Sequence, residues 1–304
     1  MISLQRGNDF ESVVDKLKDK INSMKQIKLL STVTPLLRRG AGGEVKIKSY
    51  RIMKRILIIA VAWVISNAAI AQDFKVAKSS GRLEINIGRV TVEGTTGNEI
   101  IFSSRNYLDH KDERAEGLRA INGSGLEDNT GLGINVSQNG DVVEVSQLKK
   151  MNSPDVKILV PKGVIVSFSH QSQYGGTAVF KNLENEVEVS ANYNSIEMEN
   201  VTGPLTVKTV YGHVEANLST NVKGPISIVS IYGYVDVTMP ASIKANIKMS
   251  TSYGEILVAP EIKIDIDKQG DFVRYNDKVY GKINGGGMNV DFRSDYSKIY
   301  LRKK

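Results

Sequence analysis

The side chains of this sequence that are best placed for chemistry are carboxylates that recur after a Tyr-Gly or Tyr-Asn pair. Glu197, Glu215 and Asp236 each stand four residues after the tyrosine of such a pair. If the pairs mark equivalent places of a repeat, the three carboxylates form one column on its surface. Like charges at that spacing repel one another, and a cation, a raised pKa or solvent relieves the repulsion. Such a column suits a cation, a sugar or a catalytic pair of acids.

A second column stands two residues nearer to the tyrosines. It consists of Ser195, His213, Tyr234 and Glu255, and the carboxylate column ends on Leu257. We take as the candidate binding patch His213, Glu215, Tyr234, Asp236, Glu197 and Glu255. Side chains of these types are also the ordinary covering of a solvated strand face, which is the plain alternative.

A catalytic use of the patch is the alternative to a binding use. Polysaccharide lyases and glycoside hydrolases with β-helical folds place acids on one sheet face, and Glu215 with Asp236 would be the pair here. A lyase also needs an Arg or Lys beside the acids, and the two columns contain none. The chain has no Cys, its histidines (His110, His170 and His213) are scattered, and no P-loop or G-x-S-x-G stretch occurs. We expect no catalytic residue, no metal and no cofactor.

The elements that must position the columns repeat about every 20 residues. The spacings between successive tyrosines are 19, 18, 21 and 21 residues, and a looser copy lies near the end of the chain. The motif positions are Tyr174, Tyr193, Tyr211, Gly212, Tyr232, Gly233, Tyr253, Gly254 and Tyr296. A period of this length with strand patterning is typical of a solenoid.

The phase of the alternation changes at every motif. Leu205 and Val207 share the parity of Tyr211, whereas Val214 and Ala216 have the opposite parity. A one-residue slip exchanges the two faces of a strand, and Gly, Asn and Ser tolerate the left-handed or bulged backbone that a slip requires. Each repeat therefore predicts two strands joined by a bend, with the tyrosine last on the first strand and on the core side.

These rungs predict an all-β protein, a single-stranded parallel β-helix (solenoid) over residues 151–304. Equivalent residues of neighbouring rungs then lie about 4.8 Å apart, so the tyrosines form a ladder near one corner. A single rung cannot bury its apolar face, and its neighbours complete the core. We interpret the Tyr-Gly motif as structural, a packed corner aromatic. The functional alternative is an aromatic platform for sugar rings.

Residues 72–150 predict an N-terminal β-rich capping region. The stretch "RLEINIGRVTVEG" alternates like strands, and "GINVSQNGDVVEVSQ" predicts a hairpin around Asn139-Gly140. A charged, glycine-rich loop over residues 105–133 lies between them. It lacks the D-x-[DN]-x-[DN]-G pattern of a calcium loop, so we expect a solvated loop that reaches a partner or caps an end of the solenoid.

Residues 53–71 have the features of a secretory signal peptide. Met53 is followed by two basic residues and an apolar run, and Ala69-Ile70-Ala71 supplies an A-x-A cleavage site before Gln72. We expect cleavage between Ala71 and Gln72 and export through the inner membrane. The mature protein would be periplasmic, outer-surface or secreted, with no membrane span.

Residues 1–52 precede this leader. The simplest interpretation is a wrongly assigned start, with Met53 as the initiator. The alternative is a cytoplasmic extension, because the apolar residues of 9–24 fall at helical spacing ahead of what would then be an uncleaved anchor.

The formal charge of +7 does not indicate nucleic-acid binding. Residues 1–71 contain 13 Lys and Arg against 5 Asp and Glu, and the remaining residues contain 27 against 28. A phosphate-binding surface needs local excess positive charge, which the near-neutral remainder lacks. The absence of Cys means that an exported chain must be stabilised by packing rather than by disulfides.

Several segments together resemble a known family. The Y-G-x-[IV]-x-V rungs, "GLEDNTGLG" and the closing "GKINGGGMNVDF" and "YSKIYLRK" resemble the bacterial putative-adhesin family of exported β-strand-repeat proteins, a domain of unknown function. The resemblance covers nearly all of residues 75–304. It implies a single-stranded parallel β-helix, an extracytoplasmic location and an adhesive role, and it supplies no catalytic residues.

The sequence therefore predicts an exported, non-catalytic protein that acts by surface binding, as an adhesin-like or envelope scaffold protein. The expected partner is a polysaccharide or an envelope protein. The alternative is the polysaccharide-active enzyme described above. The sequence leaves the oligomeric state open.

Overall fold

The computed structural model describes residues 73–104, 113–115, 117–267 and 277–304. Every described residue belongs to one compact unit, Ile70–Lys304. The predicted leader, the segment before it and the Ala71/Gln72 cleavage site lie outside the described residues. Within the described residues, no helix has the length and apolar character needed to cross a membrane.

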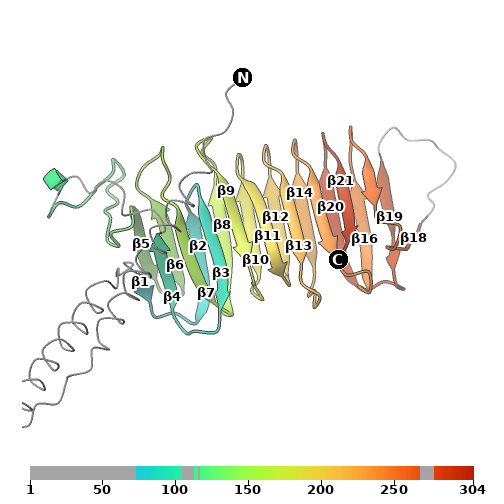
Figure 1. Cartoon of the computed structure of the whole chain (residues 1–304), viewed down its shortest axis with the longest axis horizontal. Coiled ribbons are helices and arrows are strands. Elements are labelled where there is room, and N and C mark those ends of the chain that lie inside the picture. Colours follow the sequence, from blue (N-terminus) through green and yellow to red (C-terminus); the bar gives the residue numbers. More distant parts are fainter. Residues whose placement is uncertain (1–72, 105–112, 116, 268–276) are drawn as a thin grey trace, which may run out of the picture. The chain divides into compact units, whose positions relative to one another are not determined.

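The described chain is all-β and forms two sheets whose strands are largely parallel (Figure 1). In spatial order, sheet A contains β1 (Phe74–Val76), β4 (Ile100–Ser104), β7 (Val156–Pro161), β3 (Val90–Thr95), β9 (Thr177–Lys181), β11 (Ser195–Val201), β13 (Val214–Leu218), β15 (Val235–Met239), β21 (Ile299–Lys303) and β17 (Ile256–Val258).

Sheet B contains, in spatial order, β18 (Ile264–Ile266), β19 (Lys278–Ile283), β16 (Ala245–Ser250), β20 (Met288–Ser294), β14 (Ile226–Ser230), β12 (Leu205–Thr209), β10 (Val187–Ala191), β8 (Gly163–His170), β2 (Ser80–Asn86), β6 (Val142–Gln147) and β5 (Ile134–Asn139). A short 3₁₀ turn, η1, spans Glu113–Ala115.

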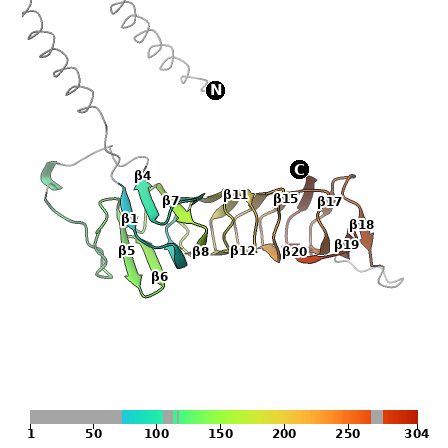
Figure 2. The same cartoon turned by 90° about the horizontal axis from the view of Figure 1, so that it is seen from below.

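The core lies between the two sheets, which face each other as two layers (Figure 2). The period-two alternation of the sequence explains this arrangement, because successive side chains of a strand point to opposite faces. In β12, for example, Leu205, Val207 and Thr209 are buried, whereas Thr206 and Lys208 are exposed. Two aromatic rings, those of Phe168 and Phe180, meet edge to face across the core at 6.1 Å.

The middle of the chain alternates regularly between the sheets, one strand in each. We call such a consecutive pair a rung: β8–β9, β10–β11, β12–β13 and β14–β15 are rungs in sequence order, and each pairs in parallel with the next. The prediction of two strands joined by a bend is confirmed here. The predicted hairpin is confirmed too, since β5 and β6 pair antiparallel and Asn139 lies opposite Val142.

The spatial order of the rungs departs from the sequence order at the C-terminal end. The last rung, β20–β21, lies between β14–β15 and β16–β17, because β20 pairs with both β14 and β16 and β21 pairs with both β15 and β17. The expectation that rungs stack in chain order, which aligned Glu255 and Leu257 directly after Tyr234 and Asp236, is therefore wrong at this point.

A four-residue crossing makes this insertion possible. β19 and β20 flank β16 on opposite sides, so residues 284–287 must pass over the start of β16. Asn284, Gly285 and Gly286 all have positive φ, at 48°, 82° and 86°, the left-handed region that Gly and Asn tolerate. A Cβ on Gly287 would collide with the Lys244 carbonyl oxygen. The three glycines are thus required by a backbone crossing.

The N-terminal end has a similar rearrangement. β2 lies between β6 and β8, and β3 lies between β7 and β9, so strands that precede residue 151 share both sheets with those that follow it. Antiparallel strands finish the sheets: β4, β1 and β5 at this end, and β19 with β18 at the other. Within the described part of the acidic loop, the Asp128 carboxylate accepts hydrogen bonds from the backbone N–H groups of Thr130, Gly131 and Gly133.

Candidate functional site

The motif tyrosines form a ladder along one corner of the two-sheet stack. Ring centroids are 5.0 Å apart for Tyr193–Tyr211 and Tyr211–Tyr232, 4.9 Å for Tyr232–Tyr296 and 5.0 Å for Tyr296–Tyr253. Neighbouring ring planes differ by 5° to 17°. The predicted ladder is thus confirmed over five rungs, with Tyr296 between Tyr232 and Tyr253 because the last rung is inserted there.

The predicted orientation of these tyrosines is wrong. Tyr193, Tyr211 and Tyr232 are 43 %, 55 % and 48 % exposed, so the rings lie outside the core. The physical reason is that β12 ends at Thr209 and β14 ends at Ser230, two residues before the tyrosine. Parity assigns faces only while the chain stays extended, and here the bend begins before the tyrosine. Tyr174, at an earlier corner, makes no ring contact with the ladder within the described residues.

Glycine follows the tyrosine because the backbones of adjacent rungs meet there. A Cβ on Gly233 would lie far inside van der Waals contact of the Gly212 carbonyl oxygen, and one on Gly254 would collide in the same way with Ser297. Neither glycine has positive φ. Space, and not a left-handed backbone, is therefore the reason for glycine at these corners, which corrects the reason given from the sequence.

A buried hydroxyl joins each rung to its neighbour at this corner. Thr209 Oγ1 donates to the Asn194 carbonyl at 3.0 Å, Ser230 Oγ to the Gly212 carbonyl at 2.8 Å and Ser294 Oγ to the Gly233 carbonyl at 2.9 Å. Ser230 Oγ also accepts the Gly233 N–H at 2.9 Å. These hydroxyls satisfy backbone groups that the bend removes from the sheet ladder.

Replacing Ser230 by Ala is expected to lower the free energy of unfolding by about 1–3 kcal/mol, because the Gly212 carbonyl and the Gly233 N–H lose their shared partner in a buried place. Urea unfolding measures the change. Ser227→Ala, on the outer face of the same strand, is the matched control and should change stability by less than about 0.5 kcal/mol. Equal effects of the two substitutions would contradict the role of the hydroxyl.

The outer face of sheet A carries the predicted columns next to the ladder. Backbone register places Glu197 beside Glu215 and Glu215 beside Asp236, and the next neighbour of Asp236 is Tyr300. In the other column the order is Ser195, His213, Tyr234, Lys298 and Glu255. The structure therefore brings all six predicted patch residues to one face and adds Lys298 and Tyr300 from the inserted rung.

Most of the carboxylates on this face have partners. The Glu215 carboxylate accepts a hydrogen bond from the Tyr234 hydroxyl. Arg302 donates to both oxygens of Asp236 at 2.7–3.0 Å, and Lys298 lies 2.6 Å from Glu255. Glu197 makes no side-chain hydrogen bond or ion pair within the described residues. Phenol and guanidinium groups thus relieve the repulsion that the sequence predicted.

The expectation that no basic side chain stands beside the acids is wrong. Lys298 and Arg302 come from the C-terminal segment "KIYLRK", and only the insertion of β21 between β15 and β17 places them there. The signal in the sequence was the alternation of this segment, in which Lys298, Tyr300 and Arg302 stand at every second position and so share one face of a strand. No cluster of three or more His, Asp or Glu side chains suited to a metal ion occurs within the described ranges.

His213 and Tyr234 form a short second stack on this face. Their ring centroids are 4.6 Å apart with planes 11° from parallel, and His213 Nδ1 lies 3.1 Å from Ser195 Oγ. Burial, followed by the hydrogen bond to Glu215, raises the pKa of Tyr234 to about 12. Because its phenol stays protonated at neutral pH, Tyr234 is a hydrogen-bond donor to Glu215 and a poor proton acceptor.

The outer face of sheet A is hollowed in two places. A hollow of about 360 Å³ lies over Glu197, Glu215, Asp236 and Arg302. A second of about 540 Å³ lies between Tyr193 and Arg89. The ladder, the two columns and these hollows form one continuous surface, which we call the ladder face. It offers phenol rims, carboxylates and cations in rows along the stack.

Comparisons with known proteins found one family and one solved structure. Residues 71–295 match the family described as Toastrack DUF4097. A solved structure described as a "putative cell adhesion protein" from Clostridium sporogenes is similar at 16% sequence identity, with 76% of this chain and 99% of that chain covered and a TM-score of 0.39. No curated protein matches the chain. Since the family match spans most of the chain, and the repeat of the sequence had already indicated such a family, this protein belongs to the Toastrack DUF4097 family.

Proposed function

We propose that this protein is an exported, non-catalytic binding protein, adhesin-like or an envelope scaffold, built as a β-solenoid with antiparallel ends. The ladder face is its binding surface. The leader in residues 53–71 supports export. The observation that carries the proposal is the tyrosine ladder itself, in which five tyrosines that are each 43–76 % exposed stack with ring centroids 4.9–5.0 Å apart.

The stacking decides what the ladder can bind. Each ring covers the faces of its neighbours, so the inner rings offer hydroxyl rims rather than open aromatic faces. An open face remains at the end of the stack, where Tyr253 is 76 % exposed. Tyrosine combines apolar area with a polar tip and suits such interfaces. A row of rims beside rows of carboxylates and cations fits an extended polymer with regularly spaced hydroxyls, which is the chemistry of a polysaccharide.

The test is binding to isolated envelope polysaccharides, measured by co-sedimentation or calorimetry. The double variant Tyr211→Ser/Tyr232→Ser should weaken binding at least about tenfold, since buried aromatic contacts at interfaces are each worth on the order of 1–2 kcal/mol. Tyr174→Ser is the matched control, because that tyrosine is also exposed at a corner but makes no ladder contact. Binding that survives the double variant, or that Tyr174→Ser weakens equally, would count against the ladder.

A polysaccharide-active enzyme is the second candidate. The contact of Arg302 with Asp236 favours it, since a basic group beside an acid is what a lyase uses. The raised pKa of Tyr234 weighs against a phenolate base. Activity on a uronic-acid polymer that Glu215→Gln abolishes would support the enzyme over the binding protein.

A further inference from the structure

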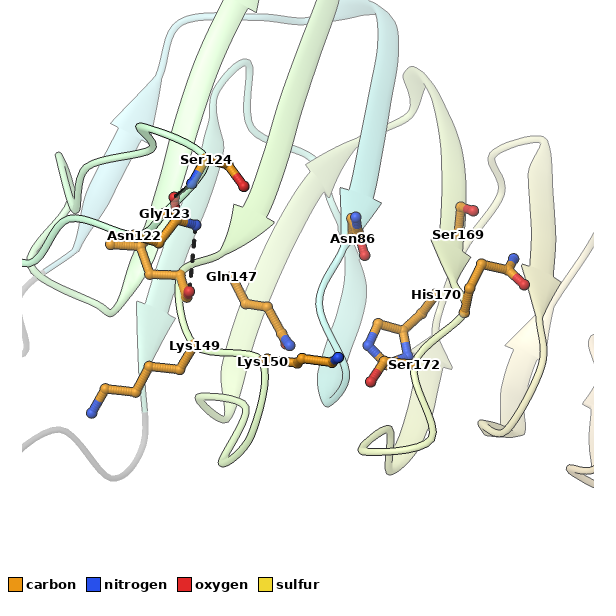
Figure 3. Close-up of a pocket in the computed structure, with 12 residues that line it drawn as sticks. Asn86, Asn122, Gly123, Ser124, Gln147, Lys149, Lys150, Ser169, His170 and Ser172 are labelled. Carbon is orange, nitrogen blue, oxygen red and sulfur yellow. Dashed lines mark hydrogen bonds between the residues drawn. The ribbon is translucent and has the colours of Figure 1, made fainter.

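A hollow of about 470 Å³ lies apart from the ladder face, at the corner where β2, β6 and β8 end (Figure 3). Its volume is in the range of sites for small molecules, roughly 300–1,000 Å³. Lys149, Lys150 and the neutral polar groups of Asn86, Gln147 and Ser172 are among the residues that line it. Within the described part of the chain, no carboxylate lines it. A hollow with cations and amides and without acids has the composition of an anion site.

The buried polar side chain of this lining is that of His170, which is 2 % exposed. Backbone register through Ala191 places it where Thr209 stands in a later rung. In that later rung, the hydroxyl of Thr209 joins the rung to its neighbour by donating to the Asn194 carbonyl. His170 makes the corresponding contact with its ring, since Nδ1 lies 2.8 Å from Asn194 Oδ1.

The contacts of Asn194 fix which nitrogen of His170 carries its proton. The amide nitrogen of Asn194 donates to the Gly88 and Gly176 carbonyls at 2.8 and 2.9 Å. Its Oδ1 must therefore accept, and His170 Nδ1 must donate. Nε2 is left with no hydrogen-bond partner within the described residues. The side chain that carries Nε2 is 2 % exposed as a whole and lines the hollow, so a ligand in the hollow can supply the partner that Nε2 lacks.

Two other side chains of the lining can donate hydrogen bonds into the hollow. Figure 3 shows the Lys150 side chain extending toward the His170 ring, whereas Lys149 points away. Gln147 accepts the Gly88 N–H through Oε1 at 2.7 Å, which leaves its NH₂ group for the hollow. Three carboxylates of sheet B, those of Glu84, Glu144 and Glu188, do not line the hollow. Glu84 and Glu188 are paired with Arg82, and Glu144 lies beside Asn139.

We propose that this hollow binds an oxyanion carried by a small hydroxylated molecule, that is, a sugar acid or a sugar phosphate. Lys150 supplies the charge, the Gln147 amide supplies a hydrogen bond to the anion, and His170 Nε2 accepts a hydrogen bond from a hydroxyl group of the ligand. Ser172 and Asn86 remain for the hydroxyl groups. The site lies beyond the proposed function, because it uses no residue of the tyrosine ladder.

The experiment is calorimetry together with imidazole-selective NMR on the full chain, which has only three histidines. The probes are glucuronate, glucose 6-phosphate, inorganic phosphate and glucose. We expect at least one of the first two to bind and to shift the His170 signal, because a hydroxyl group of the bound molecule donates to Nε2. Comparing glucuronate with glucose 6-phosphate distinguishes a carboxylate from a phosphate ligand.

Lys150→Gln should weaken binding of the successful probe about tenfold, as expected for losing one charge-assisted hydrogen bond. Lys208→Gln, an exposed lysine on the outer face of β12, is the control and should leave it unchanged. The proposal is overturned if neither sugar anion shifts the His170 signal, if glucose binds as well as they do, or if both lysine variants weaken binding equally. The Tyr211→Ser/Tyr232→Ser variant should bind the probe normally, because neither tyrosine lines this hollow. The proposal for this hollow and the proposal for the ladder can therefore be tested independently.

Discussion

Deleting residues 287–304 is expected to abolish cooperative folding, although it removes only the end of the chain. The deletion takes out β20 and β21, which lie between other strands of both sheets. It also removes four core side chains that are at most 2 % exposed, namely Val290, Phe292, Ile299 and Leu301. At about 1.5–3 kcal/mol each, their loss amounts to roughly 6–12 kcal/mol, which is comparable to the whole stability of a typical domain.

Thermal unfolding followed by circular dichroism, with limited proteolysis, measures this effect. Deleting Phe74–Val76 is the control, because β1 lies at the end of sheet A and pairs with β4, and we expect a small shift of the midpoint. A point variant gives the same comparison in an intact chain. Phe292→Ala should lower the free energy of unfolding by about 3–5 kcal/mol. Phe74→Ala, in the edge strand β1 of sheet A, should lower it clearly less. A truncated protein that melts like the full chain would show that β20–β21 is not an interior rung.

Gly233→Ala should destabilise the protein by about 3 kcal/mol or more, a large effect for one methyl group. The new Cβ would overlap the carbonyl oxygen of Gly212 in the neighbouring rung. Overpacking usually costs 1–3 kcal/mol when side chains can move, but here the obstacle is backbone. The ladder stack and the Ser230 bridge depend on the same close approach, so the rungs must separate to admit the methyl group.

The matched control is Gly97→Ala, because the nearest atom to its Cβ would be 3.6 Å away and its φ is not positive. Urea unfolding should show little change for this variant. Before the Gly233→Ala protein unfolds, the ellipticity or fluorescence of its stacked tyrosines should already differ from that of the unaltered protein, because the stack at this corner is disturbed. A Gly233→Ala protein as stable as Gly97→Ala would mean that the corner can open, and that the reason given for glycine is mistaken.

The sequence was most informative where the physical rule is local. Alternation with period two assigned the faces of β12–β15 correctly, and the Asn139-Gly140 turn predicted its hairpin. The spacing of the motif predicted a tyrosine ladder, which the ring stacking confirms. It did not predict the exposure of Tyr211 and Tyr232, because parity no longer applies once the strand has ended and the chain bends.

By itself, the sequence determined the strands, their inward faces, the corners and the family to which the repeat belongs. Only the tertiary structure decided which rung lies beside which. Every rung has the same alternation, so β14 could pair equally well with β16 or β20 as far as the local pattern is concerned. A crossing of four residues at 284–287 decides between them. The pairing of Arg302 with Asp236 follows from that choice. The free Nε2 of His170 depends in the same way on contacts between rungs far apart in sequence.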